Sequence, residues 1–366
     1  MLLPSLDSEP RFAEARELIF SNDLDWMHER QKLALVDAYL AASAEALAAL
    51  KDAICESDYY RGLPYLGPGT LMPYLSKFRN LADVLSAKAM VLNARGRTAA
   101  ALDDVLALIK MGKDVGSGES TLEALVGRAI RAHGESCMPH LISSTDDAEI
   151  CQQLIDAVGR ALSEGFAYST ALRSDLDGFV NMASDPEYLE SARQRVGDAN
   201  QRSWLPDFAY HIAQLSDEQV WQELGQSHAV LYEYLEGFDK PYPEFMSEPF
   251  PQIDPNWHDF WDTEESYRKQ KKAVIKEEAV LGASQILAGL KLCQMQTGVF
   301  PDDLEQLVPG YLAALPDDPF SCQAFGYIKE GSGAIIYSVG PDMKDDHAEK
   351  KLTRGLGEGD IVFEIR

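Results

Sequence analysis

Four aspartates near the carboxyl end are the side chains in this sequence best suited to bind a metal ion. The aspartates are Asp342, Asp345, Asp346 and Asp360, and the glycines that come before the last of them are Gly355, Gly357 and Gly359. Calcium takes roughly six to eight oxygen ligands, which the carboxylates and the carbonyls of a glycine-rich loop can provide. The residue types are therefore compatible with calcium as a cofactor. The spacing of an EF-hand loop is missing, so the alternative is a hydrated acidic loop without metal.

A second group of candidate ligands is the block from His133 to His140. On a helix, His133 and Cys137 share one face and His140 lies near it, as in the three-ligand zinc site of a metal-dependent hydrolase. However, Gly134 and Pro139 argue against a continuous helix, and the block matches no common zinc signature. We favour ordinary histidines at a helix end and keep a hydrolase that uses this block as an alternative.

Other catalytic patterns are incomplete. The Gly134-x-Ser136 phrase lacks the second glycine of a nucleophile elbow, and Gly116-Ser-Gly118 lacks the third glycine and the preceding strand of a dinucleotide site. Paired carboxylates are too frequent in this chain to indicate acid–base catalysis. We assign no catalytic residue and expect a protein that is not an enzyme.

The charge of the chain limits its partners. Its 366 residues include 59 acidic and 33 basic side chains, a formal net charge of -26. Nucleic acid and anionic membrane surfaces would be repelled by this charge. Cationic partners and hard metal ions fit it better.

The sequence has no recognisable membrane or export segment. Residues 1–10 contain neither a basic region nor an apolar run, which predicts no signal peptide and no anchor. We therefore expect no insertion of this chain into a membrane. The five cysteines are scattered and odd in number, which is not the pattern of a disulfide framework.

Helical periodicity dominates residues 12–237. The expected helices cover Trp26–Ile54, Tyr74–Ala94, Thr98–Lys113, Thr121–Leu141, a segment from Asp147 to Ser163, Phe166–Ser184 and Asp217–Leu235. The pair joined at Gly96 resembles a single tetratricopeptide hairpin, which would imply an adaptor. No fixed repeat follows, so we favour an antiparallel pair in an irregular bundle.

Proline and aromatic residues interrupt the helical pattern at residues 240–261. Five prolines between Lys240 and Trp257 predict an extended strap without helix. Its aromatic side chains are expected to fasten it to the helical body. Other aromatic residues, Trp204, Tyr210, Trp221, Tyr232 and Tyr234, are expected in the core.

The remaining residues predict an α+β domain. A long helix over Asp262–Gln296 is followed by strands at Ala324–Lys329 and Ala334–Ser338, separated by a glycine turn, and by a last strand at Ile361–Ile365. The predicted fold class is α+β. An all-helical-hairpin body (1–239) and a strap (240–261) precede a domain (262–366) with a long helix on a three- to four-stranded antiparallel sheet.

Three spaced phrases in this domain carry a family resemblance. They are Gly298-Val-Phe-Pro301-Asp-Asp-Leu304, Asp318-Pro-Phe320 and Ser338-Val-Gly-Pro-Asp342. Together they resemble the C-terminal globular domain of the major pseudopilins of type II secretion, over about Ala273 to Arg366. The resemblance implies a calcium ion that holds the C-terminal loop, with Asp342 as a ligand. For the second contribution, Asp345-Asp346 and Asp360 each match the family phrase in part, and both remain open.

The sequence departs from the family in two respects. The prepilin cleavage signature and its apolar helix are missing, and the family has no counterpart of the helical body. We therefore expect a non-enzymatic, extracytoplasmic structural or interaction protein with a protein partner, linked to secretion or the cell envelope. A cytoplasmic helical-repeat adaptor is the alternative.

Overall fold

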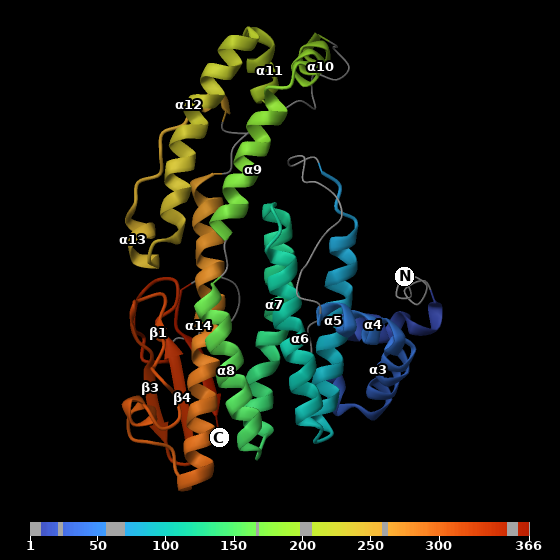
Figure 1. Cartoon of the computed structure of the whole chain (residues 1–366), viewed down its shortest axis with the longest axis vertical. Coiled ribbons are helices and arrows are strands. Elements are labelled where there is room, and N and C mark those ends of the chain that lie inside the picture. The colour runs from blue at the N-terminus through green and yellow to red at the C-terminus, as the bar shows by residue number, and fades with distance from the viewer. Residues whose placement is uncertain are drawn as a thin grey trace.

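The structure is a computed structural model that describes residues 9–20, 25–55, 70–165, 168–197, 207–257, 263–349 and 358–365. Figure 1 shows a row of long helices with a small sheet at one side and a helical arm at one end. This arrangement is α+β with a large helical part, as predicted.

The helices before the strap are 3-10 helix η1 (Pro10–Phe12), α2 (Ala13–Phe20), η2 (Asp25–His28), α3 (Arg30–Ala42), α4 (Ala44–Ile54), α5 (Tyr74–Ala94), α6 (Thr98–Gly116), α7 (Thr121–Ser144), α8 (Ala148–Glu164), α9 (Tyr168–Ala183), α10 (Pro186–Gly197), α11 (Asp207–Gln214) and α12 (Asp217–Glu236). The later elements are η4 (Gly237–Asp239), α13 (Tyr242–Ser247), η5 (Pro255–Trp257), α14 (Glu264–Thr297), η6 (Leu304–Leu307), β1 (Asp317–Asp318), β2 (Gln323–Ala324), β3 (Gly326–Glu330), β4 (Gly333–Ser338) and β5 (Ile361–Ile365).

Helices α6 and α7 cross at glycines. A Cβ atom placed on Gly112 would lie 2.6 Å from the carbonyl oxygen of Gly127, and one placed on Gly127 would overlap the backbone of Gly112 and Gly116. Because backbone cannot move aside as a side-chain tip can, only glycine allows this close approach. The crossing fixes α7, which in turn supports α14.

A glycine-to-alanine pair tests this contact. Gly127→Ala should lower the free energy of unfolding by about 1–3 kcal/mol through overpacking. Gly225 is the matched control, because it is an exposed glycine of α12 with no atom near its Cβ position. Gly225→Ala should raise stability by about 0.5–1 kcal/mol. Denaturant unfolding measures both, and equal effects would contradict the close-contact argument.

Helix α14 is shared by the helical body and the sheet. Its 34 residues lie between α8 and the strands in Figure 1, and one hydrophobic cluster includes Leu154 of α8, Leu287 of α14 and Ile336 of β4. On the sheet side, Gly289 leaves room for Leu312. The two predicted domains therefore share one core along this helix.

A buried ionic network joins α7 to α14. The Arg128 Nη2 and Arg131 Nη2 atoms lie 2.7 and 3.1 Å from the carboxylate oxygens of Glu277, and Arg131 Nε lies 3.0 Å from Glu135 Oε1. Burial raises the pKa of Glu135 to about 8, against the opposing effect of Arg131. Since removal of one member would leave a buried charge without its partner, the network fixes how α14 sits on α7.

The raised pKa predicts a pH dependence. A carboxyl whose pKa is higher in the folded state contributes stability below its unfolded pKa near 4.5, and this contribution is lost as the pH rises through about 8. Between pH 6 and 9, the free energy of unfolding of the wild type should therefore fall by about 1–3 kcal/mol more than that of the Glu135→Gln variant. Denaturant unfolding across this range is the measurement, and parallel profiles would contradict the assignment.

The sheet has the predicted antiparallel topology. Strands β3, β4 and β5 form a three-stranded sheet in that order, with Gly326 opposite Tyr337, and β1 pairs with β2 in a separate two-stranded ladder. Gly331, at φ 55°, forms the turn of the hairpin. A Cβ on Gly326 would overlap the ring of Tyr337, so this glycine lets the aromatic ring cover the neighbouring strand.

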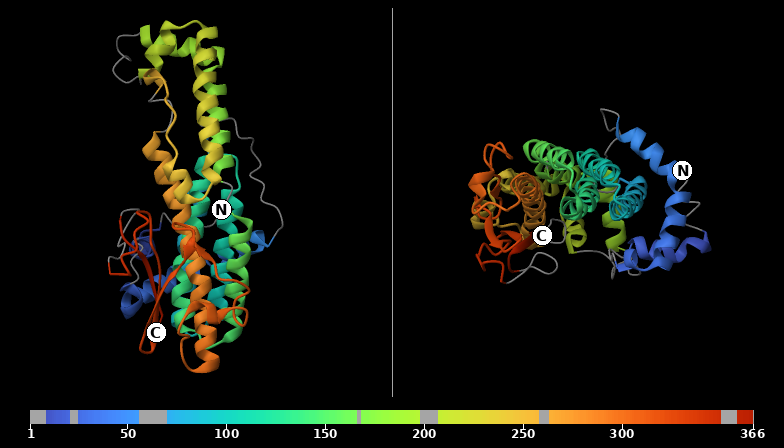
Figure 2. Two further views of the ribbon diagram at one scale, coloured as in Figure 1. Left: turned by 90° about the vertical axis from the view of Figure 1, so that its left-hand side faces the viewer. Right: turned by 90° about the horizontal axis from the view of Figure 1, so that it is seen from below.

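Helices α9 to α12 form an arm that extends beyond the other helices (Figure 2). Leu176 of α9 and Leu224 of α12 belong to a hydrophobic cluster that continues to Tyr267 of α14. The expectation that the aromatic residues are buried is wrong for Trp221, which is 51% exposed. The buried stripe of α12 contains Val220 and Leu224, and this register turns Trp221 outward. Tyr234 is buried as expected, and Trp204 lies outside the described residues.

The predicted single helix over Trp26–Ile54 is wrong. The chain forms η2, α3 and α4, and the last two are bent by 60° about Ser43. The Ser43 hydroxyl is buried and donates to the Tyr39 carbonyl at 2.9 Å. A side-chain donor of this kind competes with the backbone ladder and bends a helix.

The strap prediction is also wrong in part, because α13 and η5 lie within residues 240–257. The chain before α13 is fixed by Pro241, and Pro243 lies in the first helical turn, where a missing N–H costs little. The strap is fastened by Phe245 and Trp257, both fully buried. Its last predicted residues, 258–261, lie outside the described residues.

Helix α7 continues through Gly134 and Pro139, contrary to the sequence interpretation. A Cβ on Gly134 would lie 3.1 Å from Leu108 Cβ and from the Val105 carbonyl oxygen of α6. The glycine therefore serves the packing of α6 on α7, and tertiary contacts hold the helix together across the proline.

In the described part of the chain, no single helix is long and apolar enough to cross a membrane. Helices α3 and α4 reach this length and apolar composition only when they are taken together, with the bend between them.

Candidate functional site

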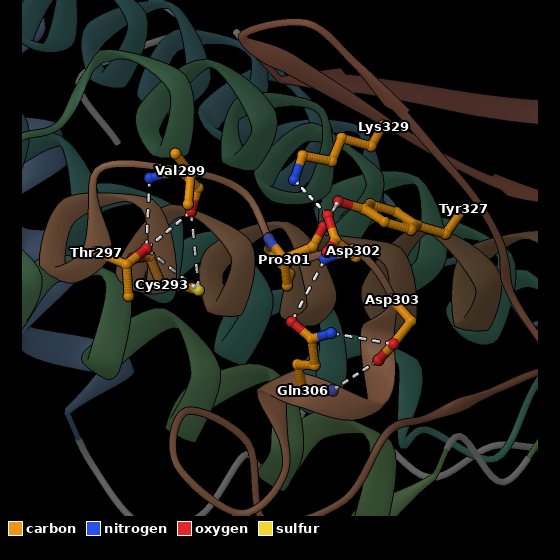
Figure 3. Close-up of polar contacts among 9 residues, drawn as sticks. All are labelled: Cys293, Thr297, Val299, Pro301, Asp302, Asp303, Gln306, Tyr327 and Lys329. Atoms are coloured by element: carbon orange, nitrogen blue, oxygen red, sulfur yellow. Dashed lines mark hydrogen bonds and ion pairs between the residues drawn. The ribbon is translucent and has the colours of Figure 1, made fainter.

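Of the three phrases that carried the resemblance, the first follows the carboxyl end of α14, whereas Phe320 of the second packs near Ile275 of α14 and Tyr242 of α13 donates to Pro341 of the third. Figure 3 shows the first of them. The Tyr327 hydroxyl of β3 donates to the Pro301 carbonyl at 2.8 Å, and Lys329 Nζ lies 2.7 Å from Asp302 Oδ1. The phrase leads into η6, which begins at Leu304 and is capped by the side chain of Asp303. These contacts tie the end of α14 to the hairpin.

The second phrase is organised by Asp318, which is 1% exposed. Its Oδ1 atom accepts from Phe320 N at 3.1 Å and from Ser338 Oγ at 2.7 Å. Its Oδ2 atom accepts from Ser321 Oγ and Val339 N, each at 3.1 Å. One carboxylate thus joins the turn after β1 to the end of β4, where the acidic loop starts.

Asp318 yields a prediction with a neighbouring control. Asp318→Ala should lower the free energy of unfolding by about 2–4 kcal/mol, because several buried donors lose their acceptor. The adjacent Asp317 is exposed, and Asp317→Ala should change stability by less than about 0.5 kcal/mol. Denaturant unfolding compares the two variants, and similar losses would contradict the role of Asp318.

The third phrase opens a loop whose two ends touch. Gly340, at φ 70°, lies so close to the Gly359 carbonyl that a Cβ on it would overlap that oxygen. Asp360 is fully buried and accepts from Ala348 N at 2.7 Å and from Asp346 N at 3.4 Å. The buried carboxylate therefore holds the first part of the loop against β5.

The predicted ligands differ in burial and in their hydrogen-bond partners. Asp342 and Asp346 are half-buried, and the Oδ2 atom of each is buried without a hydrogen-bond partner among the residues that the structure describes. Asp345 is exposed, accepts from His347 N at 2.8 Å and lies 3.1 Å from His347 Nδ1. Because a buried carboxylate oxygen without a donor destabilises the fold, a positive partner would stabilise both Asp342 and Asp346.

The electrostatics of the loop favour a cation. Burial raises the pKa of Asp360, and the carboxylates of Asp345 and Asp346 add to this effect against two backbone donors. Burial also raises the pKa of Tyr337 to about 12, with Asp345 and Asp360 contributing. The pKa of Tyr242 rises to about 12 through burial and the charge of Asp342.

The side chains alone do not complete a metal site. Within the described ranges, no group of three or more His, Cys, Asp and Glu residues could hold a metal ion. Calcium at this loop would therefore need backbone carbonyls and water beside the carboxylates. Gly355 and Gly357, expected to supply carbonyls, lie outside the described residues.

The block from His133 to His140 lines a separate cavity of about 490 Å³ between α5 and α7. His133 Nε2 lies 3.1 Å from Asp83 Oδ1, and Cys137 Sγ lies 3.5 Å from Ser86 Oγ. Burial raises the pKa of the Cys137 thiol, which disfavours the thiolate that would bind zinc or attack a substrate. The shared face of the predicted block is present, but its thiol is poorly suited to that chemistry.

In comparisons with known proteins, the chain matches no protein-family model, no curated protein and no solved structure.

Sequence reasoning found the four loop aspartates but missed the role of Asp318. The Asp-Pro-aromatic phrase drew attention to a turn, whereas the partners of its carboxylate, Ser338 and Val339, lie twenty residues away in sequence. No local pattern signals such a contact in a chain with 59 acidic residues.

Proposed function

We propose that this chain is a non-enzymatic structural or interaction protein of the cell envelope whose C-terminal domain is stabilised by calcium. The observation that carries the proposal is that Asp342 and Asp346 each keep a buried oxygen without a hydrogen-bond partner in the described part of the chain, in a loop closed by Asp360. A cation bound beside either oxygen would supply the partner that it lacks among the described residues. The resemblance to the pseudopilin domain, in which calcium holds the same loop, supports the same reading.

The roles of the aspartates differ in this proposal. Asp342 and Asp346 each direct an oxygen to the ion, while backbone carbonyls and water complete the coordination. Asp360 is a positioning residue, because its oxygens are occupied by the backbone N–H groups of Ala348 and Asp346. Asp345 is engaged by His347 and adds negative charge at the edge of the site.

An extracytoplasmic setting suits a site of this kind. Few carboxylates and a loop assembled around the ion predict weak affinity, of the order of the roughly millimolar constants of extracellular calcium modules. Such a site fills outside the cytoplasm. The location therefore follows from the expected affinity and from the resemblance.

The arm supports the interaction role. Trp221 and Val230 of α12 are 51% and 39% exposed. Aromatic and aliphatic side chains of this kind are frequent anchors in protein interfaces. The proposed partner is therefore a protein with an apolar contact surface.

Calcium should raise the melting temperature of the protein. At several millimolar calcium, a few times a roughly millimolar dissociation constant, the ion should add about 1 kcal/mol of stability. Asp342→Asn and Asp346→Asn should each remove this increase, because the amide keeps the shape but loses the charge. Thermal unfolding followed by circular dichroism, with several millimolar calcium or with chelator, is the measurement.

Two controls make the calcium experiment decisive. Asp302→Asn changes an exposed aspartate of the same domain and should keep the full calcium effect. Magnesium at the same concentration should stabilise less, since its smaller shell demands stricter geometry. An unchanged midpoint of the wild type with calcium would end the proposal.

A further inference from the structure

A cavity of about 380 Å³ lies between α6, α7 and α8, apart from the C-terminal loop and from the His133 block. Four cationic side chains line it, namely Lys110, Lys113, Arg131 and Arg160. The chain as a whole has 59 acidic and 33 basic residues, so this is a local reversal of the overall charge. Such a reversal around a concave surface attracts anions.

The acidic side chains at the cavity do not balance these cations. Lys110 Nζ lies 2.6 Å from Asp114, and Lys113 Nζ lies 2.5 Å from Glu164. The Lys113 contact lowers the pKa of Glu164, with a smaller effect from Arg160. In the described chain, the Arg160 guanidinium forms no ion pair or hydrogen bond. The rim therefore keeps a cation that can bind an incoming group.

The wall formed by α7 adds positive charge. Arg131 is 4% exposed and lines the cavity, with Arg128, Glu135 and Glu277 behind it in the network. Burial raises the pKa of Glu135 to about 8, so at neutral pH this carboxyl offsets less of the positive charge of the two guanidiniums. The wall therefore adds to the attraction of an anion bound at the Arg160 rim.

The rest of the lining is apolar. Leu106 and Ile109 of α6 face Ala157 and Ala161 of α8 across the cavity. The small alanine side chains leave room between the two helices. A purely ionic ligand would leave these surfaces in contact with water, whereas a ligand with a short hydrocarbon chain would cover them.

We propose that this cavity binds a small amphiphilic anion, with its charged head near Arg131 and Arg160 and its short apolar chain between α6 and α8. Medium-chain carboxylates are the simplest members of this class. The site is independent of the calcium loop and of the proposed envelope role.

Isothermal titration calorimetry on the full chain tests the ligand class with three probes. Sodium octanoate has both a head and a chain, 1-octanol lacks the charge, and sodium phosphate lacks the chain. Octanoate should bind at least about tenfold more tightly than either partial probe, a difference of about 1.4 kcal/mol. Equal affinity for octanol or for phosphate would overturn the proposal.

Variants locate the binding. Arg160→Gln should weaken octanoate binding about fivefold, and Ala161→Phe, which fills the apolar part, should weaken it at least about tenfold. Lys269→Gln is the matched control, because it removes an exposed cation of α14 that does not line the cavity, and it should leave the affinity within about twofold. Octanoate binding that is unchanged in both cavity variants would place the ligand elsewhere and overturn the assignment.

Discussion

Helix α14 is buried on two opposite faces, by the sheet on one and by the helical body on the other, and the rest of the structure depends on this constraint. The helix supplies the core of the sheet on one side and of the body on the other, so neither face can be solvated without loss of a whole layer. Apolar packing alone would allow the helix to slide along its neighbours. Glu277 removes this freedom, because its carboxylate must meet Arg128 and Arg131 at one position along α7. The glycine crossing of α6 and α7 then places those arginines relative to the other helices.

The parts of the fold that local chemistry controls were predictable. Helix α5 has the predicted bounds, and the turn at Gly331 and strand β5 were both expected. The failures have one local and one tertiary cause. The hydroxyl of Ser43 finds a backbone acceptor in its own helix, and the packing of α6 against Gly134 holds a helix that a proline should interrupt.

The candidate site was predictable to the level of residue type. Aspartates and glycines after a strand suggested calcium. Their roles differ in the fold, because the carboxylate of Asp360 accepts backbone N–H groups, whereas Asp342 and Asp346 each keep an oxygen without a donor among the described residues. The backbone path of the loop decides this difference. The electropositive cavity had no sequence signal. Its cations come from α6, α7 and α8, and only their packing gathers them in a chain of the opposite overall charge.

Because Gly340 contacts Gly359, the geometry of the sheet does not depend on the length of the acidic loop. Because the two ends of the loop meet at this point, β4 and β5 keep their register whatever number of residues lies between them. Closing a loop of twice the length costs only about 0.6 kcal/mol more. The loop is therefore a natural place for insertions during evolution, and for an engineered peptide tag that leaves the domain folded.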